Sequence, residues 1–441
     1  MKLHLAAAAA LALAATSQAP VLAKETSTMT ANPLATQDQT DVTARALRLL
    51  EMPEVQRARE ITAMRWKLVL RDDPPPRAWD TFDEMIDELM FNYALKAANG
   101  DPNYPRIVHI HTLPHKRKGM DVPGSRWGGD NPDNIYRMIP IDSKAHYRLD
   151  GKRSDNPPSN VTYQLVSTWE GNKTLTLLEG ADMTYGPDGS FSITLDPEPA
   201  NGRPNHIQTK PGSLWLFVRD SLGDWSQVAN TLAVHRLDPP DAPPMTDQQA
   251  AERVADIAPY GVYPAYWYLT AWNRSNTIAN FRESGPLGGI PSQRSSQIML
   301  KDLKDDEAFV LTMDPANAPY YSVVTHDDWF ISIDYANITS CLNKGQVVKN
   351  ADGSITYVVS ARDPGVHNWI NTDGVADARI LVRLQGLPEK PTKQPWIRSQ
   401  LVRLDELKAV LPKDTKWVTP EERAAQIAQR QRQIAARMAD H

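Results

Sequence analysis

The feature that most constrains the fold is a change of hydrophobic periodicity near Arg106. Beyond this point apolar and polar residues alternate with a period of two, as in Val161–Val166 and Phe191–Leu195. Alternate residues of a strand face the same side, so the pattern predicts strands with one buried face. The dipeptides Asp188-Gly189 and Asp352-Gly353 are typical of tight hairpin turns. We expect a mainly β protein whose antiparallel strands form β-sandwiches with packed inner faces.

Two stretches of this β-rich sequence are similar to each other. Tyr163 and Tyr321 begin matching apolar runs, and each run is followed by an Asp-Gly turn and an Asp-Pro pair. We therefore predict two related modules, residues 105–238 and 296–388. The alternative is that any two hairpins share these features.

Helical patterns flank and interrupt the strands, which makes the predicted class α+β with helical flanks. We expect a helical region at 41–104, a Pro-rich linker with a helical and aromatic insert at 239–295, and a C-terminal helical tail at 389–441. Thr419-Pro420-Glu421-Glu422 has the pattern of a capping box with Pro at the first helical position. The tail either lies solvated on the body or serves as an arm for a homo-oligomer.

The N-terminus resembles a secretory signal peptide at residues 1–23. Lys2 precedes a short apolar run, and Val21-Leu22-Ala23 fits a cleavage site. We expect a flexible leader at 24–40, a periplasmic location and no transmembrane segment in the mature chain; an uncleaved anchor is the alternative. The lone Cys341 is expected to be buried. The formal charge of −5 argues against a nucleic-acid partner.

The densest histidine cluster is His109, His111 and His115. Alternation on a strand would point His109 and His111 to one side, where a loop could add His115 to a zinc, copper or iron site. The spacing lacks the helical glutamate of a metalloprotease, and the basic residues 116–118 would repel a cation. The alternatives are a polar strand, or a basic loop that meets an anionic ligand. No motif indicates a cofactor, and a metal ion is the one cofactor left open.

The most distinctive segment runs from Trp127 to Arg137. Its glycines permit tight turns, and its Asp and Asn side chains favour Asx turns. It is either a structural turn or a loop that binds a small-molecule ligand. The predicted ligand-binding residues are Trp127, Asp130, Asn134, Tyr136 and Arg137.

A second polar and aromatic segment is Asp363–Trp369. His367 beside Asp363 could act as a base, because histidine titrates near neutrality. We predict Asp363 and His367 as catalytic residues and Asn368 and Trp369 as ligand-binding residues; a rigid surface loop is the alternative. The adjacent pair Asp327-Asp328 is expected to form a turn rather than a catalytic dyad.

The chain resembles a bacterial family through Asp130-Asn-Pro-Asp-Asn-Ile-Tyr136, Asp327-Asp-Trp-Phe, Asn350-Ala-Asp-Gly353 and Asp363-Pro-Gly-Val-His-Asn-Trp369. This is the domain-of-unknown-function family number 1214, often paired with number 1254, and the resemblance covers about residues 125–385. It implies exported or envelope-associated proteins with jelly-roll-like β-sandwiches, and it implies no catalytic residues.

Three functions follow as hypotheses. Twelve tryptophans against seven phenylalanines favour an aromatic cleft. The first hypothesis is therefore a periplasmic protein that binds, and in an enzymatic version transforms, a small ring-containing molecule of aromatic, steroid-like or sugar type in catabolism. The second is a metal-dependent hydrolase or lyase that uses the histidine cluster. The third is a structural or assembly protein of the envelope.

Overall fold

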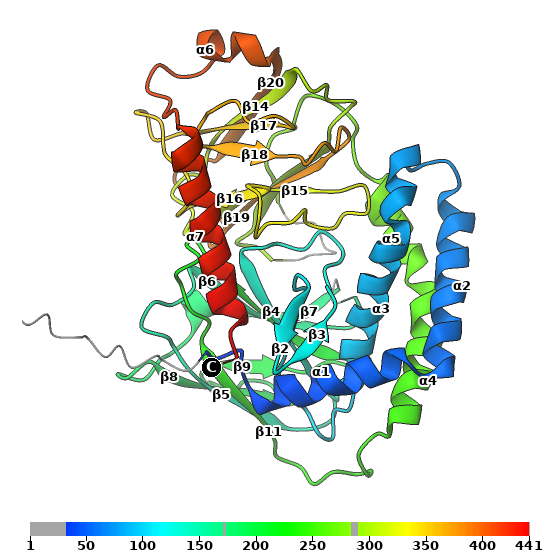
Figure 1. The fold of residues 1–441 in the computed structure, drawn as a ribbon. Helices are drawn as coiled ribbons and strands as arrows, with labels where there is room; N and C mark the ends of the chain where they lie inside the picture. The colour runs from blue at the N-terminus through cyan, green and yellow to red at the C-terminus, as the bar shows by residue number, and fades with distance from the viewer. Residues whose placement is uncertain (1–31, 171–172, 284–289, 441) are drawn as a thin grey trace, which may run out of the picture. The chain divides into compact units, whose positions relative to one another are not determined.

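The computed structural model describes residues 32–170, 173–283 and 290–440 (Figure 1). The predicted signal peptide and residues 24–31 of the predicted leader lie outside the described residues. Helix α1 (Gln37–Leu50) begins where Thr36 Oγ1 accepts a hydrogen bond from the Gln39 N–H at 3.0 Å. Residues 37–40 are therefore helical and do not belong to a flexible leader.

The first β-module consists of two sheets that share one apolar core. The five-stranded sheet has the order β1-β4-β10-β6-β7, and the four-stranded sheet has the order β11-β5-β8-β9. Leu216 and Val218 of one sheet pack in the same cluster as Leu149 and Ile193 of the other. The strands are β1 (Val108–Ile110), β4 (Asn134–Pro140), β5 (Tyr147–Lys152), β6 (Asn160–Val166), β7 (Thr174–Glu179), β8 (Ser190–Asp196), β9 (His206–Gln208), β10 (Trp215–Ser221) and β11 (Thr231–Arg236). A separate hairpin joins β2 (His115–Arg117) to β3 (Met120–Val122).

The second β-module is built in the same way. Its sheets have the orders β12-β13-β19-β15-β16 and β18-β17-β14-β20. Val323 and Val382 of the first sheet pack with Phe309 and Tyr357 of the second. The strands are β12 (Arg282–Glu283), β13 (Arg294–Met299), β14 (Glu307–Asp314), β15 (Tyr320–His326), β16 (Cys341–Asn343), β17 (Ile355–Ser360), β18 (Trp369–Asn371), β19 (Arg379–Gln385) and β20 (Trp396–Arg403).

The two β-modules have the same topology. If the nine strands of each module are numbered in chain order without the β2–β3 hairpin, both five-stranded sheets read 1-2-8-4-5 and both four-stranded sheets read 9-3-6-7. Even the parallel pair β8–β9 has its counterpart in the parallel pair β17–β18, and the other strand pairs are antiparallel. The predicted relation between the modules is confirmed in topology, as is the β-rich α+β class. The jelly-roll-like connectivity stays a prediction.

The second β-module extends beyond the predicted boundaries on both sides. Strand β20 lies inside the predicted helical tail, and β12 lies inside the predicted insert. β20 pairs with β14 over its whole length. Most of its residues are at least partly exposed, and only Ile397 is buried. An edge strand of this kind has little of the apolar signal that marks the central strands.

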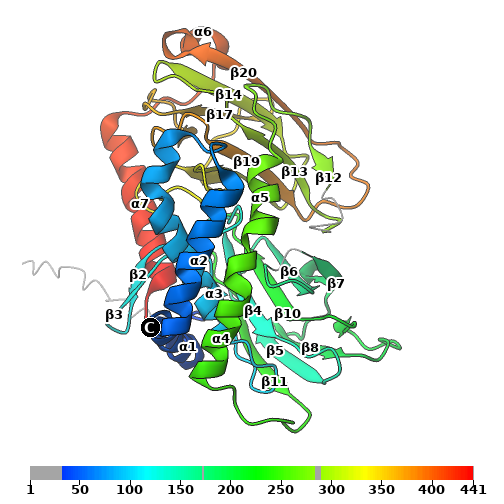
Figure 2. The same ribbon diagram turned by 90° about the vertical axis from the view of Figure 1, so that its right-hand side faces the viewer.

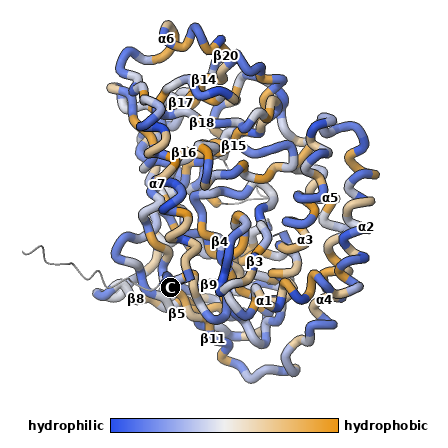
Figure 3. The backbone as a smooth tube through the Cα atoms, in the orientation of Figure 1, coloured by the Kyte–Doolittle hydropathy of each residue, from blue (hydrophilic) through white to orange (hydrophobic). Residues whose placement is uncertain are grey.

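Most of the helices pack on the outer face of the first module's five-stranded sheet. Trp66 and Phe91 from the helices share a core with Tyr136 and Phe217 from the sheet. Figure 2 shows α2, α3 and α4 beside one another, and Figure 3 shows hydrophobic and hydrophilic turns alternating along α2 and α4. The capping box that opens α4 involves Thr246 and Gln249. These elements are α2 (Pro53–Leu70), η1 (Pro76–Thr81), α3 (Phe82–Ala98), α4 (Asp247–Ile257), η3 (Ala258–Tyr260) and α5 (Val262–Thr270), while the short η2 (Gly180–Asp182) follows β7.

The C-terminal helix α7 (Pro420–Met438) lies on the body of its own chain (red in Figure 1). It follows η4 (Leu404–Glu406) and α6 (Leu407–Val410), and its predicted capping box is confirmed. Its buried residues are Arg423, Arg430 and Ile434. A homo-oligomer through this helix stays a prediction. Arg430 Nη2 lies 3.2 Å from the Sγ of Cys341, whose predicted burial is confirmed.

Among the described residues, no helix combines the length and the hydropathy needed to cross a membrane.

Candidate functional site: a cavity beneath the C-terminal helix

A cavity of about 530 Å³ lies beneath the C-terminal part of α7. Its other walls are the loop between β1 and β2, the start of β4 and the loop after β15. Its lining residues are His109, His111, Thr112, Leu113, Pro114, His115, Arg126, Asn134, Asp334, Tyr335, Ala336, Asn337, Gln431, Ile434, Ala435, Arg437 and Met438.

Strand pairing brings four of the predicted site residues to this cavity. In the antiparallel pair β1–β4, Ile110 lies opposite Tyr136, so the loop after β1 runs beside the start of β4 at Asn134. The backbone of His109 is held by Gln39, whose Oε1 accepts from the His109 N–H at 2.6 Å. His111 and His115 follow in the loop and complete the four.

Four residues of the lining carry a buried polar atom without a hydrogen-bond partner among the described residues. The atoms are His109 Nδ1, His111 Nδ1, Asn134 Oδ1 and Arg437 Nη2. Asn134 and Arg437 are each held by another atom: Asn134 Nδ2 donates to the Tyr136 hydroxyl at 3.2 Å, and Arg437 Nη1 donates to the Pro132 carbonyl at 2.7 Å. A buried polar atom without a partner costs about 1–3 kcal/mol, so a ligand that satisfies these atoms gains binding free energy.

The electrostatics of the cavity favour an anion. Burial and the nearby charges of Arg437 and Arg117 hold the pKa of His109 well below its usual value, so its imidazole is neutral at pH 7. Burial also lowers the pKa of Arg437, but a guanidinium stays protonated in proteins. No described carboxylate forms an ion pair with Arg437, which instead packs over the Trp225 ring at 5.4 Å. The Arg437 charge is therefore available to a ligand.

The nearby carboxylate of Asp133 is already engaged. Its Oδ1 accepts from Trp225 Nε1 at 2.6 Å and from Asn343 Nδ2 at 2.9 Å, and its Oδ2 accepts from the Tyr320 hydroxyl at 2.9 Å. Tyr320 and Asn343 belong to the second β-module. Asp133 is thus a buried link between the modules and not a counter-ion of the cavity.

The three predicted metal-binding histidines line the same cavity, but their side chains are not placed to hold one metal ion. His111 has a φ of 62°, which ends the strand alternation after Ile110. Its ring packs edge-on against Tyr136 with centroids 5.1 Å apart, on the helix-covered face, whereas His109 lies opposite Arg137 in the β1–β4 register. Across the described ranges, no group of three His, Cys, Asp or Glu side chains is placed to hold a metal ion.

Apart from Asn134, the predicted ligand-binding residues of 127–137 make internal contacts. Asp130 accepts hydrogen bonds from the backbone N–H and the hydroxyl of Ser332 at 2.9 and 2.5 Å. Arg137 pairs with Asp220 at 2.6 Å in the core of the first module. Trp127 packs against Trp66 with centroids 5.4 Å apart, and Tyr136 stacks on Phe217 at 5.5 Å. Through Asp130 and Ser332 the segment contacts the second module.

The Asp363–Trp369 segment is also held by structural contacts. Asp363 accepts from Arg423 Nε at 2.9 Å, and His367 Nδ1 lies 3.1 Å from Asn368 Oδ1. Asn368 Nδ2 donates to the carbonyls of Val348 and Thr356, and Trp369 Nε1 donates to Ser360. The pocket beside His367 measures only about 10 Å³, which is at most the space of one water molecule.

The two predicted loops do not form one cleft. Arg423 contacts Asp363, whereas Arg437, fourteen residues further along α7, contacts Pro132. At a rise of about 1.5 Å per residue, these contacts are roughly 21 Å apart along the helix. The loops therefore mark opposite ends of α7.

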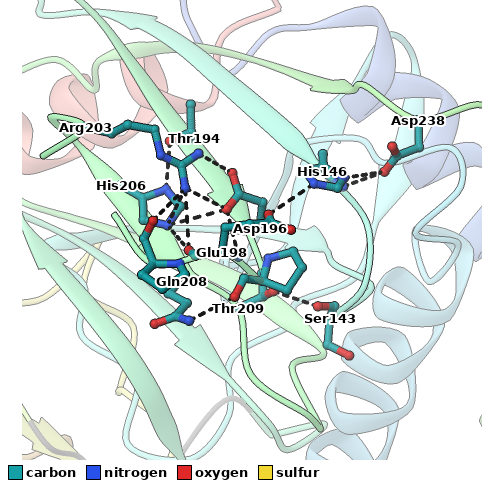
Figure 4. A network of polar contacts seen from close by, with 12 residues as sticks. Ser143, His146, Thr194, Asp196, Glu198, Arg203, His206, Gln208, Thr209 and Asp238 are labelled. Carbon is teal, nitrogen blue, oxygen red and sulfur yellow. Dashed lines mark hydrogen bonds and ion pairs between the residues drawn. The ribbon is translucent and has the colours of Figure 1, made fainter. Parts of the chain in front are cut away.

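A further polar network lies in the first module around β8 and β9 (Figure 4). Arg203 binds both oxygens of Asp196, at 2.6 and 2.9 Å. His206 lies 2.8 Å from both the Thr194 hydroxyl and the Glu198 carbonyl. These groups form hydrogen bonds with one another, so the network holds the loop between the parallel strands β8 and β9 in place.

The sequence analysis missed Arg437, the arginine of the cavity that forms no ion pair with a described carboxylate. Arg423, Arg430 and Arg437 are spaced seven residues apart, which places them on one face of a helix. That spacing could have indicated that the three arginines share a function. The sequence alone did not show which face of the helix packs on the body.

Comparisons with known proteins concern the fold and one segment of the chain. No curated protein matches the sequence significantly. An uncharacterized protein from Burkholderia cenocepacia is 23% identical with a TM-score of 0.67, over 82% of this chain and 100% of its own, and this likeness shows the fold. The VPA0106 protein from Vibrio parahaemolyticus is 11% identical with a TM-score of 0.37, over 62% of this chain and 90% of its own. Residues 298–390 match the family described as "Protein of unknown function (DUF1214)". The resemblance drawn from the sequence is thereby confirmed for residues 298–390, which lie in the second β-module.

Proposed function

We propose that this is an exported periplasmic protein that binds a small ring-shaped organic acid in the cavity beneath α7. The observation that carries the proposal is the set of four unpartnered buried atoms, His109 Nδ1, His111 Nδ1, Asn134 Oδ1 and Arg437 Nη2, on the lining of one cavity. The proposal that the protein is exported rests on residues 1–23, which resemble a signal peptide.

The chemistry of Arg437, Asn134 and His109 favours a hydroxylated acid. An unpaired guanidinium N–H of Arg437 is a strong donor for a carboxylate. Asn134 Oδ1 accepts from a hydroxyl group, and the neutral imidazole of His109 can either donate or accept. The apolar side chains Leu113 and Ile434 offer a surface to the face of a ring. A sugar acid has a carboxylate, hydroxyl groups and a ring.

The size and the mouth of the cavity agree with such a ligand. A volume of about 530 Å³ exceeds that of a single six-membered ring with its substituents. At the mouth, Gln431 Nε2 of α7 donates to Asn337 Oδ1 at 2.9 Å. This contact closes the rim between α7 and the loop after β15.

The test is a calorimetric titration of the purified protein with D-glucuronate and with D-glucose. Glucuronate is expected to bind at one site and glucose at least about tenfold more weakly, because glucose lacks the carboxylate for Arg437. Arg437→Gln should weaken glucuronate binding by a similar factor. The exposed Arg432→Gln on the same helix is the matched control and should leave binding unchanged.

A second variant covers the case that Arg437→Gln fails to fold. Asn134→Ala keeps the charge and should weaken binding of both glucuronate and glucose. The proposal is overturned if the wild-type protein binds glucuronate no better than glucose, or if folded Arg437→Gln binds glucuronate like the wild type.

A further inference from the structure

A second cavity, of about 280 Å³, does not share lining residues with the first. It is formed by α5, by the loop that follows α2 and by the start of β19. Its lining residues are Leu70, Asp73, Pro74, Pro75, Tyr266, Leu269, Thr270, Trp272, Arg274, Met299, Asp328, Trp329 and Arg379.

Arg379 is the buried charge of this cavity. Arg379 is only 4% exposed. Burial lowers its pKa to about 10, so the guanidinium is charged at neutral pH. Nη2 makes one long contact, 3.4 Å, with the carbonyl of Asp328. Nε and Nη1 have no hydrogen-bond partner among the described residues.

The acidic groups near Arg379 have other basic partners. Asp328 lies 3.6 Å from Arg77 Nε, and Asp377 lies 2.8 Å from Arg274 Nη2. No described carboxylate comes within ion-pair distance of Arg379 itself. The cavity therefore combines a buried positive charge with free N–H groups that lack an acceptor.

Aromatic rings surround this charge. The guanidinium carbon of Arg379 lies 5.5 Å from the centre of the Trp272 ring and 6.0 Å from that of Phe330. Trp272 and Tyr266 line the cavity. Trp329 also lines it; its Nε1 donates to the Ala78 carbonyl, so its ring offers an apolar wall. Flat rings pack well against such walls, in offset or edge-to-face arrangements.

From these contacts we propose that this cavity is a separate ligand site for a monocyclic aromatic carboxylate. The carboxylate accepts from a free N–H group of Arg379, and the ring lies against Trp272. The volume sets an upper limit to the ligand, since a cavity of about 150 Å³ already admits benzene. A cavity of about 280 Å³ therefore has room for one substituted ring.

The experiment titrates the full purified protein with benzoate and follows tryptophan fluorescence and calorimetric heat. Benzoate is expected to bind, because it supplies both the ring and the carboxylate. Benzamide, which keeps the ring without the charge, and acetate, which keeps the charge without the ring, should each bind at least about tenfold more weakly. Equal binding of acetate or benzamide, or no binding of benzoate, overturns the proposal without any variant.

Variants locate the site. Arg379→Gln should weaken benzoate binding at least about tenfold. Arg219→Gln is the matched control. Arg219 is a half-buried arginine with a buried, unpartnered Nη1 that stacks on an aromatic ring, Phe217, but it lies outside the cavity. Folded Arg379→Gln that binds benzoate like the wild type contradicts the proposal.

The two sites are separable in the same experiments. Arg437→Gln should retain benzoate binding, and Arg379→Gln should retain glucuronate binding. Loss of benzoate binding in Arg437→Gln alone would place the aromatic acid in the α7 cavity and overturn the second site.

Discussion

Arg423 and Arg437 lie on one face of α7 and contact different β-modules. Arg423 Nε donates to Asp363 of the second module at 2.9 Å, and Arg437 Nη1 donates to the Pro132 carbonyl of the first at 2.7 Å. The helix therefore joins the modules as a strut. The candidate cavity forms at its first-module end, where Arg437 keeps one N–H free.

Removing the Arg423 contact should loosen the strut at its other end. Asp363→Ala is expected to lower the free energy of unfolding by about 1–3 kcal/mol, because it leaves the largely buried Arg423 guanidinium short of its charged partner. Urea denaturation measures the change, with the exposed Asp405→Ala as control. Asp363 was predicted as catalytic; loss of glucuronate binding at unchanged stability would contradict the structural role.

Asp133 should matter more to stability than any residue of the Asp363 loop. Asp133→Ala removes the acceptor of Trp225, Tyr320 and Asn343 at once. We expect a loss of about 3 kcal/mol or more in denaturant unfolding, since each buried donor left unpaired costs about 1–3 kcal/mol. The exposed Asp121→Ala is the control. A change in Asp133→Ala no larger than in the control would show that this network does not hold the modules together.

Asp130 should make stability depend on pH. Burial raises its pKa to about 6, above the value of about 3.9 in an unfolded chain. The folded state therefore holds the proton more tightly, and the contribution of Asp130 to stability declines as the pH rises from about 4 to about 6. Asp130→Asn keeps an acceptor for the Ser332 N–H and should raise the unfolding free energy at pH 7 by up to about 3 kcal/mol.

The pH series contains its own check. Below about pH 4 wild type and Asp130→Asn should converge, because Asp130 is then protonated in both states. A constant difference between them from pH 4 to pH 8 would rule out the titration of Asp130 as its source.

His146 should make stability depend on pH above the range in which Asp130 titrates. Its hydrogen bond to Asp238, at 3.1 Å, and its contact with Glu198 raise its pKa (Figure 4). The contribution is complete below the unfolded pKa of about 6.5 and is lost as the pH rises through the folded value. His146→Gln should cost less than about 1 kcal/mol at pH 5.5, because the pair is exposed and screened, and nothing at pH 9. Melting curves at both pH values measure it; an equal loss at both would exclude a charge effect.

The sequence predicted the parts of the fold that depend on local pattern. Alternation and Asp-Gly turns identified the two β-modules, and the capping box at Thr419 placed the start of α7. The exposed edge strand Trp396–Arg403 was missed because its burial comes from pairing with β14 rather than from its own periodicity. Local patterns predict the central strands and the helices, whereas an edge strand is recognised only from its pairing with a strand far along the chain.

The candidate site was predicted only in part for a similar reason. His109 and Asn134 were singled out by their residue types, and both line the cavity. Arg437 comes from the end of the chain, some 300 residues after Asn134, so no local motif connects them. The Asp-Asn-Pro-Asp loop looked like a ligand loop because buried polar links between modules use the same residues as binding sites do, as Asp133 illustrates.

The measurement that tests the central claim most directly is a crystal structure of the protein with D-glucuronate at a concentration that saturates calorimetric binding. The account predicts the ligand in the cavity beneath α7, with its carboxylate within about 3 Å of Arg437 and hydroxyl groups at hydrogen-bond distance from Asn134 and His109. Glucuronate bound elsewhere, or a cavity that holds only water, would contradict it.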